Sequence, residues 1–361
     1  MSYLKFDKTL MANLDESLQR EYIRTNRKGA YSSSTIVGCN TRKYHGLLVV
    51  PIPELGDQNR VLLSSLDLTI IQHGAEFNVA VHHYKGGVIS PNGHKYIREY
   101  NVDIIPATIF RVGGVVLKRE QVFCHYINRA IFKYTLMEAH SDTLLRFRPL
   151  LAFRSVAALT HENGQIERGH IPARNGIGIS LYKGYPHLFM QFIKEPEYRE
   201  EGYWYKDFEY PKEKERGYEC TEDLYMPGTF EIPIKKGESI YFAAGLEEAN
   251  PNTLRTTFVK EVRERIPRED FFSCLRNAAH QLYYRPTPDD GYLLAGYPWF
   301  DVRARDLFVA LPGCTLCVEA PERFERIVNT VIPAMERYMR LHEDDETIHG
   351  LHEPDVGIWA I

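Results

Sequence analysis

Two stretches near the end of the 361-residue sequence gather charged and aromatic side chains that could do chemistry. In the first, GYPWFDVRARD, the aromatic residues Trp299 and Phe300 stand just before the adjacent pair Arg305 and Asp306. An aromatic ring offers a stacking plane and an arginine offers a fork of hydrogen-bond donors, and a sugar-binding site needs both. Alternatively, Asp306 caps an apolar helix that starts here, because the helix dipole favours a carboxylate at that end.

The second stretch, ETIHGLHEPDVGIWAI, brings imidazole and carboxyl groups together just before an apolar run. Asp355 and Trp359 are four residues apart, so on a helix they would share a face and the carboxyl group would lie beside the indole. An aromatic wall raises the pKa of a carboxyl group, which can then donate a proton as a general acid. A metal site made of His349, His352 and Glu353 is another interpretation, but the spacing fits no zinc pattern, so we expect no metal or other cofactor. A solvated polar loop is the third interpretation.

A third stretch, residues 197–230, mixes many charges with tyrosine and tryptophan. It is interpreted either as an exposed loop between strands or as a loop that lends Glu222, Asp223 and Tyr225 to the pocket of a neighbouring domain. The block NTRKYHG, near the other end of the chain, has a similar ambiguity. It either contacts a substrate or forms a tight corner in which His45 bonds to the backbone.

The elements that must position these side chains fall into two regions. From about residue 20 to 250, short β-branched and aromatic runs are bounded by Gly, Pro, Asn or Asp, which predicts an antiparallel β-sandwich. From about residue 268 the spacing becomes helical, and the first helix ends at a proline. We therefore expect a sandwich domain over residues 1–255, then a polar linker and helices over residues 256–361. The last residues are apolar, so the helical domain is expected to lack some of its packing partners.

The composition argues against a nucleic-acid partner, a membrane segment and a disulfide framework. Lys and Arg total 44 against 48 Asp and Glu, and no basic block is present, so a nucleic-acid partner is not expected. Neither an apolar leader nor a membrane-length apolar run is found, so we expect a cytoplasmic protein with no membrane segment. The six Cys are scattered, which indicates reduced thiols rather than a disulfide framework.

Four blocks of the sequence, in this order, resemble the glycogen debranching enzymes of the amylo-α-1,6-glucosidase type: residues 25–49, 222–230, 295–313 and 353–361. The resemblance runs from about residue 20 to the end of the chain. It implies a β-sandwich like the galactose-mutarotase supersandwich, followed by the first helices of an (α/α)6 toroid. It also implies hydrolysis of the α-1,6-linked glucose left at branch points of glycogen, with glycogen, branched α-glucan or limit dextrin as the substrate.

The resemblance further implies roles for individual residues. Arg305 and Asp306 would bind hydroxyl groups of the terminal glucose, and Trp299 and Phe300 would line that subsite. Asp355 would be the general acid that protonates the glycosidic oxygen. Trp359 would form a wall of the same pocket.

The implied mechanism is inverting and needs a second carboxylate. That general base would activate a water molecule from the opposite face of the sugar, about 6.5 to 9.5 Å from the acid. In the family the base lies further downstream, in later helices of the toroid. We therefore expect this chain to be the N-terminal part of a debranching enzyme, inactive alone, with the missing half of the toroid as a possible partner.

Two alternative functions stay open. One is another (α/α)6 carbohydrate enzyme, such as a trehalase or a disaccharide phosphorylase. The other is a non-catalytic glycan-binding or regulatory module in which the sandwich holds glycogen without cleaving it.

Overall fold

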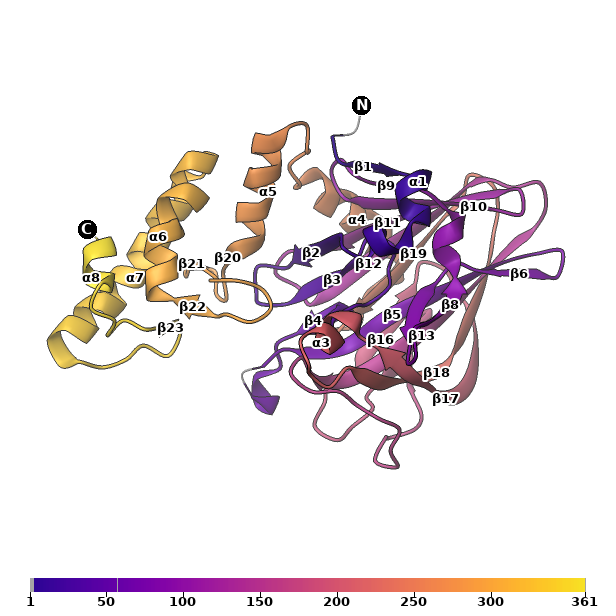
Figure 1. The fold of residues 1–361 in the computed structure, drawn as a ribbon, viewed down its shortest axis with the longest axis horizontal. Coiled ribbons are helices and arrows are strands. Elements are labelled where there is room, and N and C mark those ends of the chain that lie inside the picture. The colour runs from indigo at the N-terminus through magenta and orange to yellow at the C-terminus, as the bar shows by residue number, and fades with distance from the viewer. Residues whose placement is uncertain (1–2, 57, 361) are drawn as a thin grey trace. The chain divides into compact units, whose positions relative to one another are not determined.

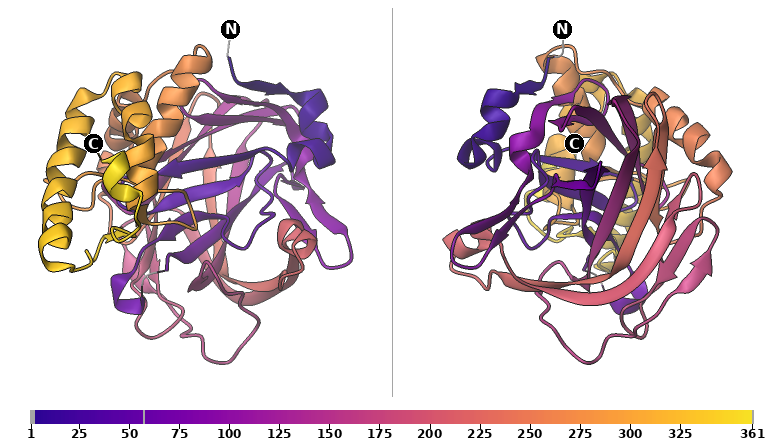
Figure 2. Two further views of the ribbon diagram at one scale, coloured as in Figure 1. Left: turned by 60° about the vertical axis from the view of Figure 1, so that its left-hand side comes forward. Right: turned by 90° about the vertical axis from the view of Figure 1, so that its right-hand side faces the viewer.

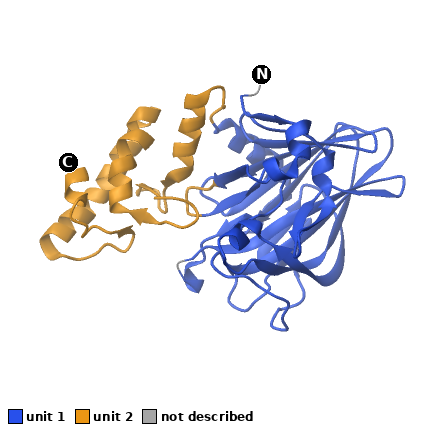
Figure 3. Cartoon of the chain, viewed as in Figure 1, with its two compact units in different colours: residues 1–24, 30–265 blue, residues 25–29, 266–361 orange. Residues whose placement is uncertain are grey.

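The chain divides into two compact units in a computed structural model that describes residues 3–56 and 58–360. Unit 1 comprises residues 1–24 and 30–265, and unit 2 comprises residues 25–29 and 266–361 (Figure 3). Unit 1 holds almost all of the strands, and unit 2 holds the longer helices (Figure 1). Each unit has a hydrophobic core of its own.

One sheet of unit 1, called sheet 1, has nine strands in the described part of the chain. Its spatial order is β1-β9-β10-β11-β12-β19-β16-β15-β14, and the strand pairs with a defined register are antiparallel. The strands of sheet 1 are β1 (Lys5–Asp7), β9 (Ile97–Val102), β10 (Pro106–Val112), β11 (Val115–Phe123), β12 (Arg129–Glu138), β14 (Ile171–Ala173), β15 (Gly176–Ile179), β16 (Leu188–Phe192) and β19 (Ser239–Gly245).

The other sheet, called sheet 2, has ten strands among the described residues, in the order β2-β3-β4-β5-β13-β18-β17-β7-β8, with β6 paired to β5. Its longest strands are strongly curved (Figure 2). The strands of sheet 2 are β2 (Glu21–Thr25), β3 (Tyr31–Thr35), β4 (Gly46–Val50), β5 (Arg60–Gln72), β6 (Ala75–Asn78), β7 (Val81–Tyr84), β8 (Val88–Asn92), β13 (Thr143–Ser155), β17 (Glu197–Glu209) and β18 (Thr221–Ile234).

Aromatic side chains from both sheets fill the space between them. The rings of Phe147 in sheet 2 and Phe242 in sheet 1 are stacked with centroids 6.4 Å apart, and Phe192 lies 5.2 Å from Phe230 across the same core. All four side chains are buried. Because large apolar side chains of two sheets interdigitate, unit 1 is a β-sandwich. The sequence prediction of an antiparallel sandwich is confirmed.

Four short α-helices among the described residues belong to the sandwich unit, and one of them lies in the segment that was expected to be a polar linker. The helices are α1 (Lys8–Ala12), α2 (Leu14–Ser17), α3 (Pro211–Glu215) and α4 (Leu254–Arg263). Helix α4 falls within the segment expected to be a polar link. It buries Leu254 and Phe258 against Tyr241 of β19, on the side of sheet 1 opposite to the central core. Its apolar residues stand four apart, which puts them on one helical face.

Unit 2 contains four α-helices within the described residues: α5 (Phe271–Leu282), α6 (Ala304–Cys314), α7 (Pro321–Leu341) and α8 (Val356–Trp359). The helical spacing seen in the sequence therefore predicted α5 correctly. Its amino end is fixed by a capping box between Asp270 and Ser273. No helix in the described part of the chain is long and apolar enough to cross a membrane.

Residues 25–29 join unit 2 through the end of α5. The side-chain amide oxygen of Gln281 accepts a 2.9 Å hydrogen bond from the backbone of Thr25, and the Thr25 hydroxyl donates to the Gln281 carbonyl at 3.0 Å. The amide of Arg285 donates to the carbonyl of Arg27 at 2.7 Å. These bonds make the short N-terminal segment part of the helical unit.

Candidate functional site

A short parallel strand pair brings the two stretches of chemical interest together in unit 2. Strand β22 (Val302–Arg303) leads directly into α6, and it pairs with β23 (Ile348–His349). The paired residues Val302 and Ile348 are both buried in the core of unit 2. The start of α6 and the segment before α8 are therefore held side by side by backbone pairing and apolar packing.

At this junction Arg305, Glu353, Asp355 and Trp359 form what we call the Arg305 cluster. One guanidinium nitrogen of Arg305, Nη2, lies 2.7 Å from Oδ1 of Asp355 and 2.9 Å from Oε2 of Glu353. The indole N–H of Trp359 donates to Oδ2 of Asp355 at 3.3 Å. The sequence prediction that Asp355 and Trp359 share a helical turn is confirmed, whereas the role of Glu353 as a partner of Arg305 was not foreseen.

The charge state of Asp355 differs from the one expected. The hydrogen bond from Arg305 is the main reason that the pKa of Asp355 lies below its ordinary value of 3.8, and the charge of Arg305 adds to this effect. The same pairing raises the pKa of Arg305. The expectation of a raised pKa is therefore wrong, because the carboxylate of Asp355 accepts hydrogen bonds from Arg305 and from the indole N–H of Trp359, and both lower its pKa.

Asp306 lies in the first turn of α6 but does not cap it. The N-cap residue is Arg303, and no side chain provides a capping hydrogen bond. The Asp306 side chain is exposed, and none of the described residues donates a hydrogen bond to its carboxylate. The cap interpretation is thus wrong, and the carboxylate keeps its capacity to accept hydrogen bonds from a ligand.

Trp299 and Phe300 precede the cluster and are well exposed, at 57% and 46% of their surface. The guanidinium of Arg303 lies over the Phe300 ring, 4.8 Å from its centroid. One face of Phe300 is therefore occupied by a cation–π contact. Trp299 is the larger exposed aromatic surface in this region.

The histidines of the second stretch do not gather around Glu353. His352 lies 3.7 Å from Asp344, and His349 is exposed. Within residues 3–56 and 58–360, the one group of three metal-binding side chains whose ligand atoms lie within 4.8 Å of one another is in unit 1, at His125, Glu261 and Glu264. The metal interpretation of the second stretch therefore finds no support in the geometry.

The unit 1 group is held by an arginine. Arg265 donates to Glu261 at 2.9 Å and also contacts the His125 ring and the Phe123 carbonyl. The backbone amide of His125 donates to Glu261 at 3.0 Å. A guanidinium already provides the positive charge that a metal ion would bring. We therefore interpret this group as a structural ion-pair network that joins the end of α4 to the β11–β12 turn.

Residues 197–230 are not a loop, which corrects one expectation. The segment consists of strand β17, helix α3 and most of strand β18. Glu222, Asp223 and Tyr225 lie on β18, and all three are buried in unit 1. Strand alternation was hidden in the sequence because both faces of β18 are covered.

These three side chains have partners inside the sandwich. Arg154 makes two hydrogen bonds to the Glu222 carboxylate, one of them 2.8 Å long, and the hydroxyl of Tyr210 donates to the same group. Asp223 accepts hydrogen bonds from the backbone amides of Glu162 and Asp207, both at 2.9 Å. The geometry favours a structural role for these carboxylates.

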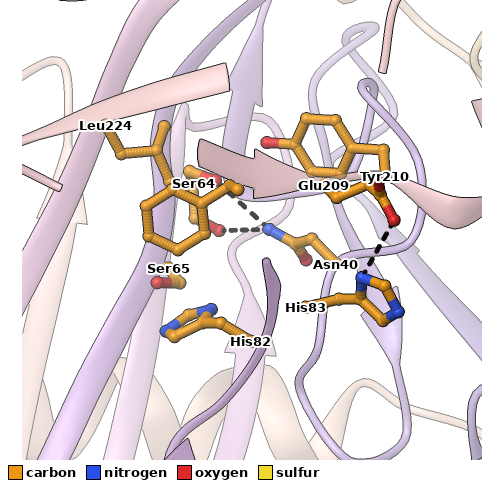
Figure 4. Close-up of a pocket in the computed structure, with 9 residues that line it drawn as sticks. Asn40, Ser64, Ser65, His82, His83, Glu209, Tyr210 and Leu224 are labelled. Atoms are coloured by element: carbon orange, nitrogen blue, oxygen red, sulfur yellow. Dashed lines mark hydrogen bonds and ion pairs between the residues drawn. The ribbon is translucent and has the colours of Figure 1, made fainter. Parts of the chain in front are cut away.

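A small polar cavity inside unit 1 is the subject of Figure 4. The side-chain amide of Asn40 donates to the carbonyl and hydroxyl of Ser64, and His83 is paired with Glu209 at 3.4 Å. The neighbouring His82 is paired with Asp67 at 2.8 Å. The cavity has a volume of only about 10 Å³, which is room for one water molecule and not for a sugar ring.

The NTRKYHG block forms a tight corner. The backbone amide of Thr41 donates to Nδ1 of His45 at 3.2 Å, and Nε2 of His45 lies 3.7 Å from Glu21. Burial is the main cause of a lowered pKa for His45, so this imidazole is neutral at pH 7. The interpretation in which His45 bonds to the backbone is confirmed.

Comparisons with known proteins identify the family of this chain. The family model described as glycogen debranching enzyme N terminal matches residues 20–241. No curated protein matches the chain. The solved structures with distant similarity include a bacterial glucoamylase complexed with acarbose, with a TM-score of 0.42 and 8% identity, covering 88% of this chain and 50% of that chain. They also include a putative aldose 1-epimerase from Escherichia coli K12, with a TM-score of 0.31 and 10% identity, covering 63% of this chain and 100% of that chain. The chain thus spans half the length of the glucoamylase chain.

Proposed function

Because the chain belongs to the family of glycogen debranching enzyme N-terminal domains, we propose that it acts in glycogen debranching, by hydrolysis of the α-1,6-linked glucose at branch points. The family match over residues 20–241 is the observation that carries this proposal. The substrate would be glycogen or a limit dextrin. We also propose a cytoplasmic location, which the free thiols of all six cysteines support.

The Arg305 cluster is the proposed site for the terminal glucose. Arg305 can donate several hydrogen bonds in a fixed plane, and the carboxylate of Asp306 next to it can accept hydrogen bonds from sugar hydroxyl groups. Adjacent donors and acceptors of this kind can hold neighbouring hydroxyl groups of a sugar. Trp299 and Phe300 would line this subsite.

The proposed general acid, Asp355, needs a change in its contacts before it can act. A carboxylate that accepts a hydrogen bond from arginine is held in its ionised form and cannot donate a proton. Sugar hydroxyls compete for the same N–H groups of Arg305. We propose that binding of glucose draws Arg305 away from Asp355, which removes the main cause of the lowered pKa and lets the carboxyl group take up the proton that it later donates.

The second carboxylate of the mechanism has to come from another part of the enzyme. Glu353 and Asp355 both lie within 3 Å of the same nitrogen of Arg305, so they are closer together than the separation of about 6.5 Å or more that an inverting pair requires. We propose that the base belongs to an (α/α)6 toroid of which α5 to α8 form one part.

Binding of a limit dextrin tests the proposal directly. The 361-residue chain is expected to bind a limit dextrin that carries α-1,6-linked glucose, as measured by calorimetry. Replacement Asp306→Asn should weaken binding about tenfold or more, since a hydrogen bond to a charged group contributes about 1.5 to 3 kcal/mol. The exposed Asp289→Asn is the matched control and should leave the affinity unchanged. Equal affinity of the Asp306→Asn variant and the parent chain would contradict the proposed subsite, and absence of binding to any branched α-glucan would contradict the proposed function.

A further inference from the structure

A larger cavity, distinct from the site proposed above, lies in unit 1 between α4 and sheet 1. Its volume is about 480 Å³, within the range of about 300 to 1,000 Å³ that is typical of small-molecule sites. Its walls come from α4, from strands β11, β12 and β19 and from the segment between β9 and β10. Every lining residue belongs to unit 1, so the cavity is a property of that unit alone.

One side of the cavity is apolar. Ile105, Tyr241 and Phe258 are buried there, and the rings of Tyr241 and Phe258 meet edge to face with centroids 5.6 Å apart. Ile104 and Val259 are large apolar side chains that stay exposed at the mouth. An apolar ligand body would cover this surface and remove it from water.

The other side is charged and built around one carboxylate. Both oxygens of Glu120 are occupied, since Lys118 donates to Oε1 at 2.8 Å and Lys133 donates to Oε2 at 3.0 Å. Burial alone would raise the pKa of Glu120, but the hydrogen bonds and charges of the two lysines outweigh it and lower the pKa. Glu120 is therefore ionised at pH 7, and two ammonium groups face one carboxylate.

Positive charge remains in excess. Each ammonium group has three N–H donors, so Lys118 and Lys133 keep donors beyond those used on Glu120. Arg263 and Asp103 are exposed residues of the same lining. The lining thus contains three cationic and two anionic side chains, a net charge of about +1.

The lining does not favour a sugar. Stacking on a sugar needs an open aromatic face, but Tyr241 and Phe258 are almost fully buried. The ammonium of Lys133 also lies over the Phe258 ring, 5.9 Å from its centroid. An anion with an apolar body matches both sides of the cavity.

We propose that this cavity binds a small amphiphilic carboxylate, with its anionic group on Lys118 and Lys133 and its apolar body against Ile104, Val259 and Val262. The ligand class follows from the excess positive charge beside an apolar wall. The site would be an additional binding site in the sandwich unit, independent of the proposed action on glycogen.

Octanoate is the probe for this proposal, titrated into the full chain by calorimetry. Octanoate should bind at least about tenfold more tightly than octan-1-ol, which lacks the charge, and than acetate, which lacks the apolar body. Octylamine should bind more weakly still, because its charge is repelled. Maltotriose should not displace octanoate. Equal binding of octanoate and octan-1-ol, displacement by maltotriose, or no octanoate binding would overturn the proposal.

Two substitutions at the same ion-pair group should change the affinity in opposite directions. Lys133→Gln should weaken octanoate binding about tenfold, whereas Glu120→Gln should strengthen it, because it removes the competing carboxylate. Lys236→Gln, at an exposed lysine outside the cavity, is the matched control. Loss of affinity in both the Lys133→Gln and Glu120→Gln variants would show general damage to the cavity and would contradict the proposed anion site.

Blocking the mouth provides a check that does not depend on charge. Val259 is exposed on α4, so Val259→Trp can fill the mouth with little effect on folding. Octanoate binding should be lost while the melting temperature stays within a few degrees of the parent value. Unchanged octanoate affinity in this variant would place the ligand elsewhere and would refute the proposal.

Discussion

Arg305 controls the charge of Asp355 at the scale of single residues. The sequence places these two residues fifty positions apart and gives no direct sign that they meet. The Asp355–Trp359 pair is predictable from the sequence because it lies within one helical turn. The Arg305 contact is not predictable, because it depends on the pairing of β22 with β23, and strands of two residues leave no pattern in a sequence.

Replacement Arg305→Met should raise the pKa of Asp355. In the parent chain the arginine stabilises the ionised carboxylate, so the pKa lies below 3.8, and without the arginine the pKa should rise. The titration of the Asp355 carboxyl carbon, followed by NMR, measures this change. Arg340→Met, on the last turn of α7, is the control and should leave the titration unchanged. A pKa of Asp355 that is the same in Arg305→Met and in the parent would show that the contact is not formed in solution.

Glu222 should contribute to stability rather than to catalysis. Replacement Glu222→Gln leaves the buried guanidinium of Arg154 without its partner, so the free energy of unfolding of unit 1 should fall by about 3 to 5 kcal/mol. Denaturant unfolding followed by fluorescence measures the change. Glu219→Gln at an exposed pair should alter stability by less than about 0.5 kcal/mol. A Glu222→Gln variant as stable as the parent would contradict the structural role.

At the scale of elements, the sequence predicts which segments are helices or strands better than it predicts which of them contact one another. Helix α5 and the sandwich strands outside residues 197–230 are predicted from the sequence, because alternation and helical spacing are local signals. Strand β18 and helix α4 were misread, one as a loop and the other as a linker. In both cases the polar residues that suggested exposure are buried as partners of other side chains, as in Glu222 with Arg154 and Glu261 with Arg265.

The corner formed by the NTRKYHG block should make unit 1 sensitive to acid. Burial alone would raise the pKa of Glu21, but the hydrogen bond from His45, together with the hydrogen bond and charge of Arg42, outweighs it and lowers the pKa from 4.5 to about 2. A carboxyl group with a lowered pKa in the folded state stabilises the fold above its unfolded pKa, and this contribution is lost as the pH falls toward the folded value. The free energy of unfolding should therefore fall between about pH 4.5 and pH 2.

The variant Glu21→Gln isolates this contribution. It should be less stable than the parent at pH 7, and its stability should fall less steeply across the same acidic range. Glu195→Gln, at an exposed position, should follow the pH profile of the parent. Parallel pH profiles of Glu21→Gln and the parent would contradict the lowered pKa.

At the scale of the whole molecule, the proposed function rests on different observations in the two units. The family match falls on residues 20–241 and thus within the stretch that contains the sandwich, whereas the Arg305 cluster lies in unit 2. Residues 25–29 bind to α5 and belong to unit 2, so the matched stretch also contributes to the helical unit. The sequence alone predicted the order of the two folds, while the composition of each core and the side-chain partners depended on contacts far apart in the chain.

The titration of Asp355 with and without isomaltose tests the central claim most directly. Isomaltose carries the α-1,6 linkage, and its terminal glucose should take up the N–H groups of Arg305. We predict that the pKa of Asp355 lies below 3.8 in the free chain and rises when isomaltose saturates it. An Asp355 pKa that stays low at saturating isomaltose would contradict its proposed role as the general acid of a debranching site.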